Sequence, residues 1–238
     1  MNTRALYVVA KQPAAGQTKT RLCPPLQGEE AADLYAAFLA DTLAIMRCVP
    51  QVRRGIAYLP EGGDAYFRAL APDMELVLQQ GNSLGERLDH LITQALADGA
   101  AQVVVMDSDS PTLPPHYVAQ AYALLDGDAD AVFGPCHDGG YYLVGMKRPL
   151  PALLREVQMS TPTVLADTLA IAAREGVRVG LLPEWYDVDT GEELAQLVGE
   201  LQNGSAAPAE HTRRGLAALA WPVAHNTNGG TNGSGRSG

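Results

Sequence analysis

The stretch that decides the fold is Val103-Val104-Val105-Met106, which runs directly into Asp107-Ser108-Asp109-Ser110-Pro111. Four consecutive apolar residues suit a strand covered on both faces, as in a parallel sheet between layers of helices. In such sheets, ligands bind beyond the carboxyl ends of the strands. The stretch therefore predicts an α/β protein whose site residues directly follow its apolar runs.

The same alternation of apolar runs and helical patterns continues along most of the chain. Expected strands lie at 5–10, 55–59, 75–79, 103–106, 131–134, 142–146 and 177–182. Helices with apolar residues at helical spacing are expected at 29–49, 83–98, 115–125 and 163–175. This order predicts a Rossmann-like, doubly wound, mainly parallel sheet with helices on both faces.

Length and composition favour one globular domain followed by a polar tail. A chain of 238 residues with 47% hydrophobic residues can bury one sizeable core. We expect residues 1–202 to form this single domain. Residues 203–238 are rich in Gly, Asn and Ser, and we expect them to be largely disordered because they bury too little apolar surface. A short piece at 216–221 is the part that could dock.

Charge and cysteine content exclude several classes of function. The net charge of -10 argues against a nucleic-acid partner, which needs a broad basic face. The three cysteines are widely spaced and form no CxxC pair, so neither a disulfide framework nor a zinc knuckle is expected. The apolar run at 6–10 is too short for a signal peptide or a membrane span. We expect a cytoplasmic protein without a membrane partner.

A basic arm follows the first expected strand. Residues 1–28 contain no acidic residue, although the chain as a whole is acidic. Lys supplies point charge and Arg a fork for phosphate oxygens, while Pro and Gly shape a loop that lets the backbone approach a ligand. The arm is expected to bind nucleotide phosphates through Lys11, Pro13, Gly16, Lys19 and Arg21.

Two other interpretations of the arm are open. It can be a solvated basic loop without a ligand. It also resembles a Walker loop at Gly16-x-x-Lys19-Thr20, but that motif requires Gly directly before the Lys, where this chain has Thr18.

Two pairs of carboxylates are candidate metal ligands. Asp107 and Asp109 stand at the carboxyl end of the buried strand, and Asp187 and Asp189 follow the last expected strand. Carboxylate oxygens suit Mg²⁺ or Mn²⁺, which bridges phosphate oxygens. If the second pair approaches Asp109, one ion gains ligands from two distant parts of the chain. The alternative for the first pair is an Asx-capped turn before Pro111.

Two further segments support a ligand site. The segment 134–143 is expected to contact an acceptor through Asp138, Gly139, Gly140 and Tyr141, although a plain hairpin is the alternative. Either Tyr141 or Tyr142 should belong to the core, and His137 is more typical of a surface loop than of a base.

The second segment opens the helix expected at 83–98. Its Gly81 and Gly85, together with the helix N-terminus, are expected to contact a base or phosphate. Ser83 and Glu86 suit a capping box, and a plain loop with a cap is an equally good interpretation.

Together these segments resemble a known bacterial family. The motifs are Lys-x-Pro-x-x-Gly-x-x-Lys-Thr-Arg-Leu, Asp-Ser-Asp-Ser-Pro-Thr-Leu, Asp-Gly-Gly-Tyr-Tyr-Leu-Val-Gly and Asp-Val-Asp-Thr, in this order over about residues 4–200. They resemble the glycosyltransferase-like family, which is similar to 2-phospholactate guanylyltransferases. The resemblance implies a nucleotide-diphospho-sugar transferase (GT-A) fold. It also implies phosphate binding by Lys11, Lys19 and Arg21, and metal binding by Asp109 with Asp187 or Asp189.

Three functions fit these residues. The first is nucleotidylyl transfer from a nucleoside triphosphate to a phosphorylated small-molecule acceptor with release of pyrophosphate, with Lys19, Arg21 and Asp109 as catalytic residues. The second is glycosyl transfer from a nucleotide sugar, with Asp138 or His137 as the base. The third is nucleotide binding without catalysis, which leaves the Asp pairs unexplained. We favour the first function, with Mg²⁺ or Mn²⁺ as cofactor. Neither the base, the acceptor nor the oligomeric state can be predicted.

Overall fold

The computed structural model describes residues 3–203 and 209–219, and most of the predicted tail lies outside these residues. The strands are β1 (Arg4–Lys11), β2 (Val52–Leu59), β3 (Glu75–Leu78), β4 (Gln102–Met106), β5 (Ala131–Pro135), β6 (Tyr141–Met146) and β7 (Val179–Leu181). The helices are η1 (Thr20–Leu22), α1 (Gly28–Cys48), α2 (Asp64–Leu70), α3 (Leu84–Ala97), α4 (Pro115–Asp126), α5 (Ala152–Arg155), α6 (Val164–Arg174), α7 (Gly191–Gln202) and α8 (Glu210–Ala218).

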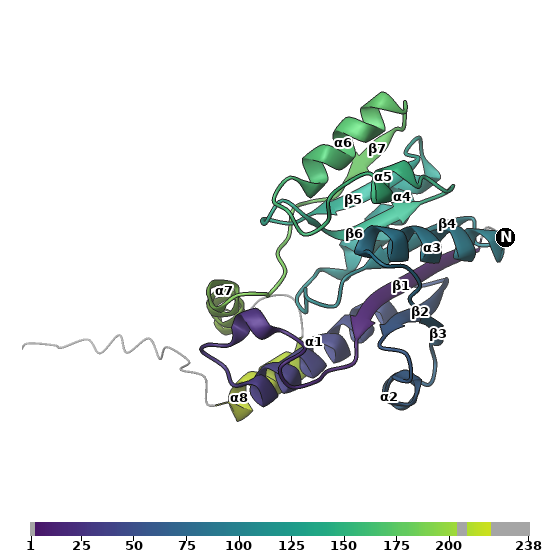
Figure 1. The fold of residues 1–238 in the computed structure, drawn as a ribbon. Coiled ribbons are helices and arrows are strands. Elements are labelled where there is room, and N and C mark those ends of the chain that lie inside the picture. The colour runs from purple at the N-terminus through teal and green to yellow at the C-terminus, as the bar shows by residue number, and fades with distance from the viewer. Residues whose placement is uncertain (1–2, 204–208, 220–238) are drawn as a thin grey trace, which may run out of the picture.

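The described strands form one seven-stranded sheet in the order β3-β2-β1-β4-β6-β5-β7 (Figure 1). Neighbouring strands are parallel except that β6 runs antiparallel to both β4 and β5. The connection between β5 and β6 is too short for a parallel crossover, so it forms a hairpin. The first residue of β6 consequently lies at the edge of the sheet where the other strands end. The predicted mainly parallel α/β sheet is confirmed.

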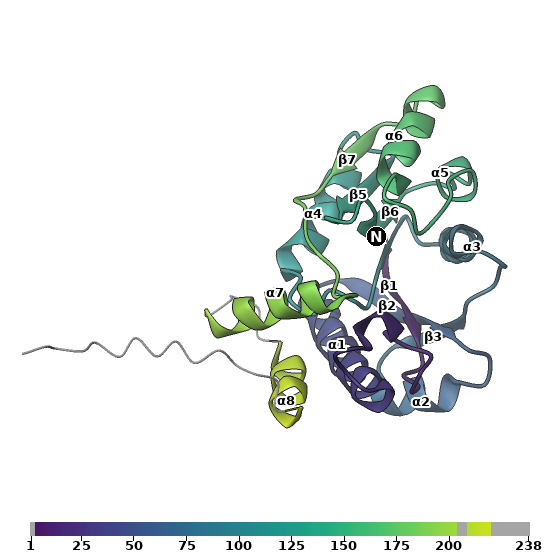
Figure 2. The same cartoon turned by 60° about the vertical axis from the view of Figure 1, so that its left-hand side comes forward.

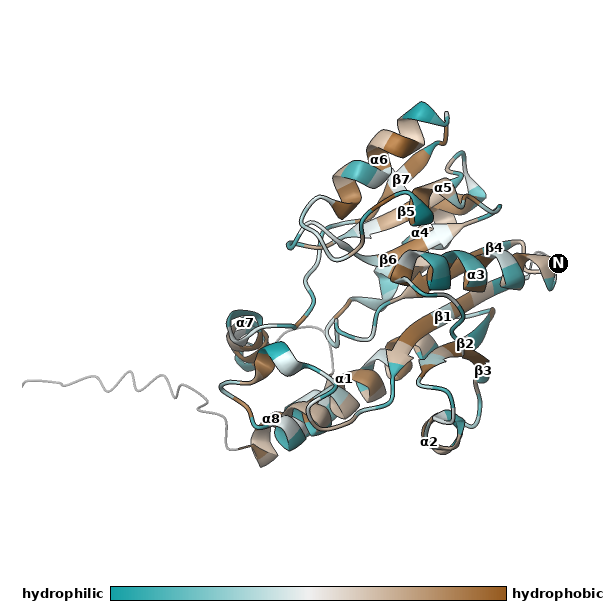
Figure 3. Ribbon diagram, in the orientation of Figure 1, coloured by the Kyte–Doolittle hydropathy of each residue, from teal (hydrophilic) through white to brown (hydrophobic). Residues whose placement is uncertain are grey.

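Helices cover both faces of the sheet (Figure 2). Leu39, Phe67 and Tyr122 belong to a core that packs α1, α2 and α4 on one face. Leu91, Leu153 and Ile171 belong to a second core that packs α3, α5 and α6 on the other face. In Figure 3, α3 alternates between hydrophilic and hydrophobic colours, as expected for a helix with one buried side. No helix among the described residues is long and apolar enough to cross a membrane.

A third core lies outside the sheet and joins η1, α7 and α8 to α1. Helix α8 falls within the predicted tail, so residues 209–219 differ from the expected disorder. The reason is Asp41 of α1, a residue that is 4% exposed. It accepts hydrogen bonds from the backbone N–H groups of His211 and Thr212, at 3.1 Å and 2.7 Å. These are unpaired donors of the first turn of α8, and satisfying them allows the helix to dock.

Candidate functional site

The candidate site is a cleft of about 830 Å³ beyond the carboxyl ends of β1 and β4. This volume suits a ligand of nucleotide size. Many residues predicted from the sequence line the cleft, namely Lys11, Lys19, Arg21, Asp107, Asp109, Asp138, Gly140, Tyr141, Asp187 and Asp189. The structure therefore brings together the basic arm, both acidic pairs and part of the 134–143 segment.

Lys19 lies at the centre of the charged groups. Its ammonium is 2.8 Å from Asp109 Oδ1 and 2.7 Å from Asp189 Oδ1, and its side chain is 4% exposed. The rings of Tyr35 and Phe38 lie 5.9 Å and 6.0 Å from Nζ. Burial by itself would lower the pKa of Lys19, but Asp109 and Asp189 together raise it above its usual value. Lys19 is thus a charged ammonium that joins the arm to both acidic segments.

In this geometry two cations of the arm are paired with carboxylates. Lys19 was predicted to bind phosphate, whereas its ammonium is already paired with two carboxylates that were predicted to bind metal. Arg21 also pairs with Asp189, and this carboxylate raises the pKa of Arg21. Lys19 and Arg21 therefore give Asp109 and Asp189 the positive charge that a metal ion would otherwise supply.

The segment that carries Asp187 and Asp189 is held in place by its backbone. Trp185 N–H donates to the carbonyl of Pro135 at 3.0 Å, which continues the pairing beyond β5. Val188 N–H donates to the carbonyl of Asp109 at 2.9 Å. The predicted approach of the second acidic pair to Asp109 is therefore present in the structure.

Asp107 and Asp187 are carboxylates that form no ion pair within the part of the chain that the structure describes. Asp107 accepts hydrogen bonds from Asp109 N–H and Ser110 Oγ, each at 3.2 Å. Burial, and then the charges of Asp109 and Asp187, raise the pKa of Asp107 well above its usual value. Burial, and then Asp189 and Asp138, raise the pKa of Asp187 to about 6. This excess of negative charge is what a divalent cation would neutralise.

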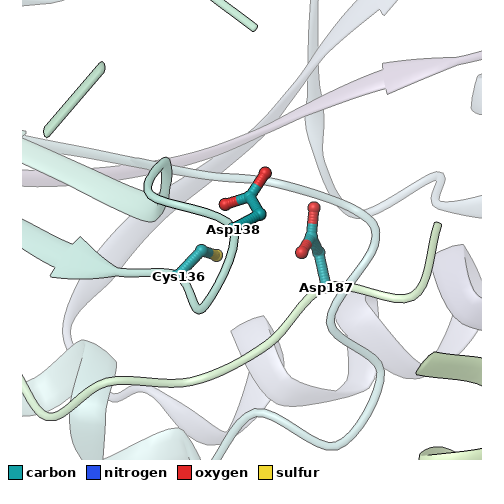
Figure 4. A group of neighbouring side chains, drawn as sticks. All are labelled: Cys136, Asp138 and Asp187. Carbon is teal, nitrogen blue, oxygen red and sulfur yellow. The ribbon is translucent and has the colours of Figure 1, made fainter. Parts of the chain in front are cut away.

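Asp187 also belongs to a compact group with Cys136 and Asp138 (Figure 4). One ligand atom from each residue lies within 4.8 Å of the others. Cys136 is 5% exposed, and burial followed by the charge of Asp107 raises the pKa of its thiol. The carboxylates of Asp138 and Asp187, with Asp107 nearby, are oxygen donors of the kind Mg²⁺ or Mn²⁺ prefers. The sequence had indicated Asp138 as an acceptor contact or a base, and it had not indicated Cys136 as a site residue.

The 134–143 segment divides between the cleft and the core. Gly140 and Tyr141 line the cleft, while Tyr142 is buried and donates its hydroxyl hydrogen to the carbonyl of Pro183 at 2.9 Å. Gly139 does not line the cleft, because it meets the protein rather than a ligand. A Cβ at Gly139 would lie 1.9 Å from the carbonyl oxygen of Pro162.

The structure places the other predicted glycines outside the cleft. Gly85 lets α3 approach α5, because a Cβ there would lie 1.9 Å from the carbonyl oxygen of Leu154. Gly81 lies in the turn before α3, and Pro13 with Gly16 lies in the loop of the arm; none of the three lines the cleft. Close packing of α3 against α5 accounts for Gly85 without a ligand.

Several residues that line the cleft were not predicted. Tyr35 of α1 accepts a hydrogen bond from Lys11 N–H at 3.1 Å, and its hydroxyl is 2.9 Å from Ser108 Oγ. Arg87 of α3 and the loop residues 159–162 also line the cleft. The position of Arg87, one turn into a helix that follows a strand's carboxyl end, is a signal that could have indicated it. No local signal indicates Tyr35, since it lies on a helix that reads as core.

Helix capping near the site differs in one detail from prediction. Glu86 N–H donates to Ser83 Oγ at 3.1 Å, as expected for the start of α3. The Glu86 carboxylate, however, accepts from Asn82 N–H at 2.7 Å rather than from the cap residue. At α7, the Glu193 carboxylate accepts from Thr190 N–H at 2.7 Å, as expected if Thr190 caps this helix.

Solved structures of known proteins share this architecture. A protein from Desulfovibrio desulfuricans G20, described provisionally as a nucleotide-diphospho-sugar transferase, is 32% identical over 92% of this chain and 97% of its own, with a TM-score of 0.84. CMP:2-keto-3-deoxy-manno-octonic acid synthetase complexed with CTP is 10% identical over 84% of this chain and 99% of its own, with a TM-score of 0.57. A cytidylyltransferase from Leptospira borgpetersenii serovar Hardjo-bovis is 12% identical over 92% and 95%, with a TM-score of 0.56.

These likenesses establish the nucleotide-diphospho-sugar transferase fold that the motifs implied. Among curated proteins, none matches this chain. A family described as "Uncharacterized protein conserved in bacteria (DUF2064)" matches residues 42–161, which is half of the chain. The chain therefore belongs to the DUF2064 family.

Proposed function

We propose that the protein is a divalent-metal-dependent nucleotidylyltransferase. The observation that carries the proposal is one cleft in which the carboxylates of Asp107, Asp138 and Asp187, without cationic partners among the described residues, adjoin a basic arm. Such a site can hold a metal ion and a polyphosphate together. A phosphorylated acceptor would attack the α-phosphorus of a nucleoside triphosphate, and pyrophosphate would leave.

The residues suited to the metal are Asp107, Asp138 and Asp187. An Mg²⁺ or Mn²⁺ ion bound there would supply charge neutralisation to phosphate oxygens. Asp109 and Asp189 remain candidate ligands only if Lys19 moves away from them, because their charge is already compensated. In this proposal Lys19 is a positioning residue: its ion pairs hold the arm, the 107–110 turn and the 185–189 segment in fixed relative positions.

The nucleotide is assigned to the side of the cleft formed by the arm. Lys11 lines the cleft, is exposed and has no ion-pair partner among the described residues. Its ammonium is therefore free to meet phosphate oxygens, whereas Lys19 and Arg21 are paired. Val9, Ala10 and Leu59 add apolar surface on which a base could rest.

The proteins of similar fold support this reaction class without identifying the substrate. One is described as a cytidylyltransferase, and another as a synthetase complexed with CTP. The resemblance of the motifs to 2-phospholactate guanylyltransferases remains a prediction, and neither base nor acceptor follows from the cleft.

Glycosyl transfer is the second candidate, because the 32% identical protein is provisionally described as a nucleotide-diphospho-sugar transferase. It requires a base for the acceptor hydroxyl. Asp138 lines the cleft and could take this role. His137 is 54% exposed, lies 4.0 Å from Glu184 and does not line the cleft, so the structure does not favour it.

A paired assay discriminates these functions. Nucleoside triphosphates with small phosphorylated acceptors are assayed for pyrophosphate, and nucleotide sugars for released diphosphate, each with Mg²⁺, with Mn²⁺ and with EDTA. We expect metal-dependent pyrophosphate release. Release of nucleoside diphosphate from sugars without any pyrophosphate would replace the proposal by glycosyl transfer, and binding without turnover would leave nucleotide binding alone.

A matched pair of variants tests the site. Asp187→Asn should lower metal-dependent turnover by at least about 100-fold, a loss typical for a group that stabilises transition-state charge. Asp128→Asn is the control, because the Asp128 side chain is 98% exposed and does not line the cleft. Equal turnover in both variants would remove Asp187 from the site.

A further inference from the structure

Arg87 is a cleft residue whose charge the described structure does not satisfy. It lies on α3 and lines the cleft. Its Nε is buried and has no hydrogen-bond partner, and no ion pair among the described residues includes it. Lys19 and Arg21 of the same cleft, by contrast, pair with carboxylates. A buried N–H group without a partner is rare in folded proteins and costs free energy that a bound anion would recover.

Arg87 and the basic arm lie on opposite sides of the sheet edge. The arm packs on α1, where Lys19 lies near Tyr35 and Phe38. Helix α3 covers the other face through Leu88 and Leu91. Asp107, Asp109 and Asp138, at the ends of β4 and β5, line the same cleft. A group bound by Arg87 is therefore distinct from the nucleotide phosphates that the arm would bind.

The wall around Arg87 is held rigidly by close backbone contacts. Residues 159–162 share this wall. Their segment is fixed at one end where Gly85 meets the Leu154 carbonyl and at the other where Gly139 meets that of Pro162. Between them, Ser160 has a φ of 62°, a left-handed conformation that residues other than Gly rarely adopt.

Hydroxyl groups and a guanidinium thus line one preorganised wall. Ser160 is exposed, and Thr161 donates its hydroxyl hydrogen to the carbonyl of Gln158 at 3.0 Å, which leaves its oxygen able to accept. A guanidinium fork matches two oxygens of a phosphate group, and a serine hydroxyl can donate to a third.

We propose that Arg87 binds the phosphate group of the acceptor, with Ser160 as a second donor. This assignment rests on the proposed function, because it gives the nucleotide to the arm wall and the acceptor to the α3 wall. It names the residue that selects an anionic acceptor over a neutral one. The chemistry is specific to a planar, bidentate cation, so Lys at this position should restore binding only in part.

The test is isothermal titration of the full chain with inorganic phosphate at constant ionic strength, in the presence of Mg²⁺ and the nucleoside triphosphate that binds most tightly. Arg87→Gln, Arg87→Lys and Lys11→Ala are compared with wild type. Arg68→Gln is the charge-matched control, since Arg68 is 69% exposed and lies outside the cleft. Circular dichroism establishes that each variant is folded.

We expect Arg87→Gln to weaken phosphate binding about tenfold or more, as for loss of a hydrogen bond to a charged group, and to change triphosphate affinity less than twofold. Lys11→Ala should show the reverse pattern, and Arg68→Gln should resemble wild type. Unchanged phosphate affinity in folded Arg87→Gln, or no phosphate binding by wild type at millimolar concentrations, would overturn the proposal. An equal loss of triphosphate affinity would overturn the assignment to the acceptor.

The titration separates this proposal from the proposed function. If no acceptor yields pyrophosphate but phosphate binding still depends on Arg87, nucleotidylyl transfer fails and the anion site stands. If pyrophosphate forms at the wild-type rate in Arg87→Gln at low acceptor concentration, the anion site fails and the reaction stands.

Discussion

At the scale of single residues, the site is organised by charges that are compensated and charges that are not. Lys19 neutralises Asp109 and Asp189. Burial and neighbouring carboxylates, in contrast, raise the pKa of both Asp107 and Asp187. Removing one partner of a buried ion pair leaves the other group charged in a poorly solvated place, which costs more than the pair contributed. Leaving carboxylates crowded has a cost of its own, which a metal would remove. Substitution of Lys19 should therefore lower the stability of the protein, whereas substitution of Asp187 should raise the stability of the metal-free protein.

Lys19→Ala should destabilise the protein. Asp109 and Asp189 are 31% and 23% exposed, so we expect about 2 kcal/mol, below the 3–5 kcal/mol typical of fully buried pairs. That loss corresponds to a fall in Tm of roughly 4–8 °C. Thermal unfolding measures it, with Lys147→Ala as a surface control. Recovery of Tm on adding Mn²⁺ is expected, because the two freed carboxylates can then bind the ion; an unchanged Tm in the variant would contradict the role of Lys19.

Asp187→Asn should instead stabilise the metal-free protein. The pKa of Asp187 is raised to about 6, so folding favours its protonated form. The resulting penalty is absent below the unfolded pKa, near 4, and is fully present once the pH exceeds about 6. After discounting for partial exposure, we expect about 1 kcal/mol, or roughly 2–4 °C in Tm at pH 7.5 in EDTA. The gain should disappear at pH 4, and a lower Tm at pH 7.5 would contradict the crowding of carboxylates.

At the scale of elements, α8 shows how a distant residue can decide whether a segment folds. The first turn of α8 contains no residue that caps it locally, and Asp41 on α1 supplies the acceptor from 170 residues away. A sequence pattern reports neighbours along the chain, so it could not indicate this contact. The same limitation applies to Tyr35, which joins Lys11 to Ser108 across the cleft.

Asp41→Ala should release α8 from α1. Loss of an N-terminal cap costs about 1–2 kcal/mol, and here the loss falls mainly on residues 209–219. We expect these amides to lose protection in hydrogen exchange while β1 and β4 keep theirs. Asp33→Ala on the exposed side of α1 is the control. Uniform loss of protection across the sheet would show that α8 supports the whole domain rather than docking on it.

At the scale of the whole molecule, hydrophobic patterning predicted the strands of the sheet. The antiparallel direction of β6, the helices α2 and α5, and the polar contacts had to be found in three dimensions. Apolar runs identified all seven strands, because burial on both faces leaves a direct imprint on composition. The rule that ligands bind beyond strand ends also located the cleft, and most of the predicted site residues line it. It could not show which cation pairs with which carboxylate, since Lys19 and Asp189 meet only through the folded path of the chain. Glycines such as Gly85 were ambiguous, because close packing and ligand binding favour the same residue.

Binding of a nucleoside triphosphate in the cleft should raise the free energy of unfolding of the protein. A nucleoside triphosphate at about 100 times its Kd adds about 2.7 kcal/mol to stability if it binds only the folded state. This corresponds to a rise in Tm of roughly 5–10 °C. Thermal shift with a panel of triphosphates should show the rise with Mg²⁺ or Mn²⁺ and lose most of it in EDTA. Equal shifts with and without metal would contradict a metal-bridged polyphosphate.

The path of the segment after β7 has a consequence for how the cleft comes into being. All seven strands are complete by Leu181, yet Asp187 and Asp189 arrive later and are tethered through Val188 to the turn after β4. A chain shortened to residue 184 would retain the seven strands of the described sheet but lack both carboxylates. During synthesis, the strands of the sheet therefore emerge from the ribosome before Asp187 and Asp189 do, and the charge-balanced site can form only after these two residues have emerged.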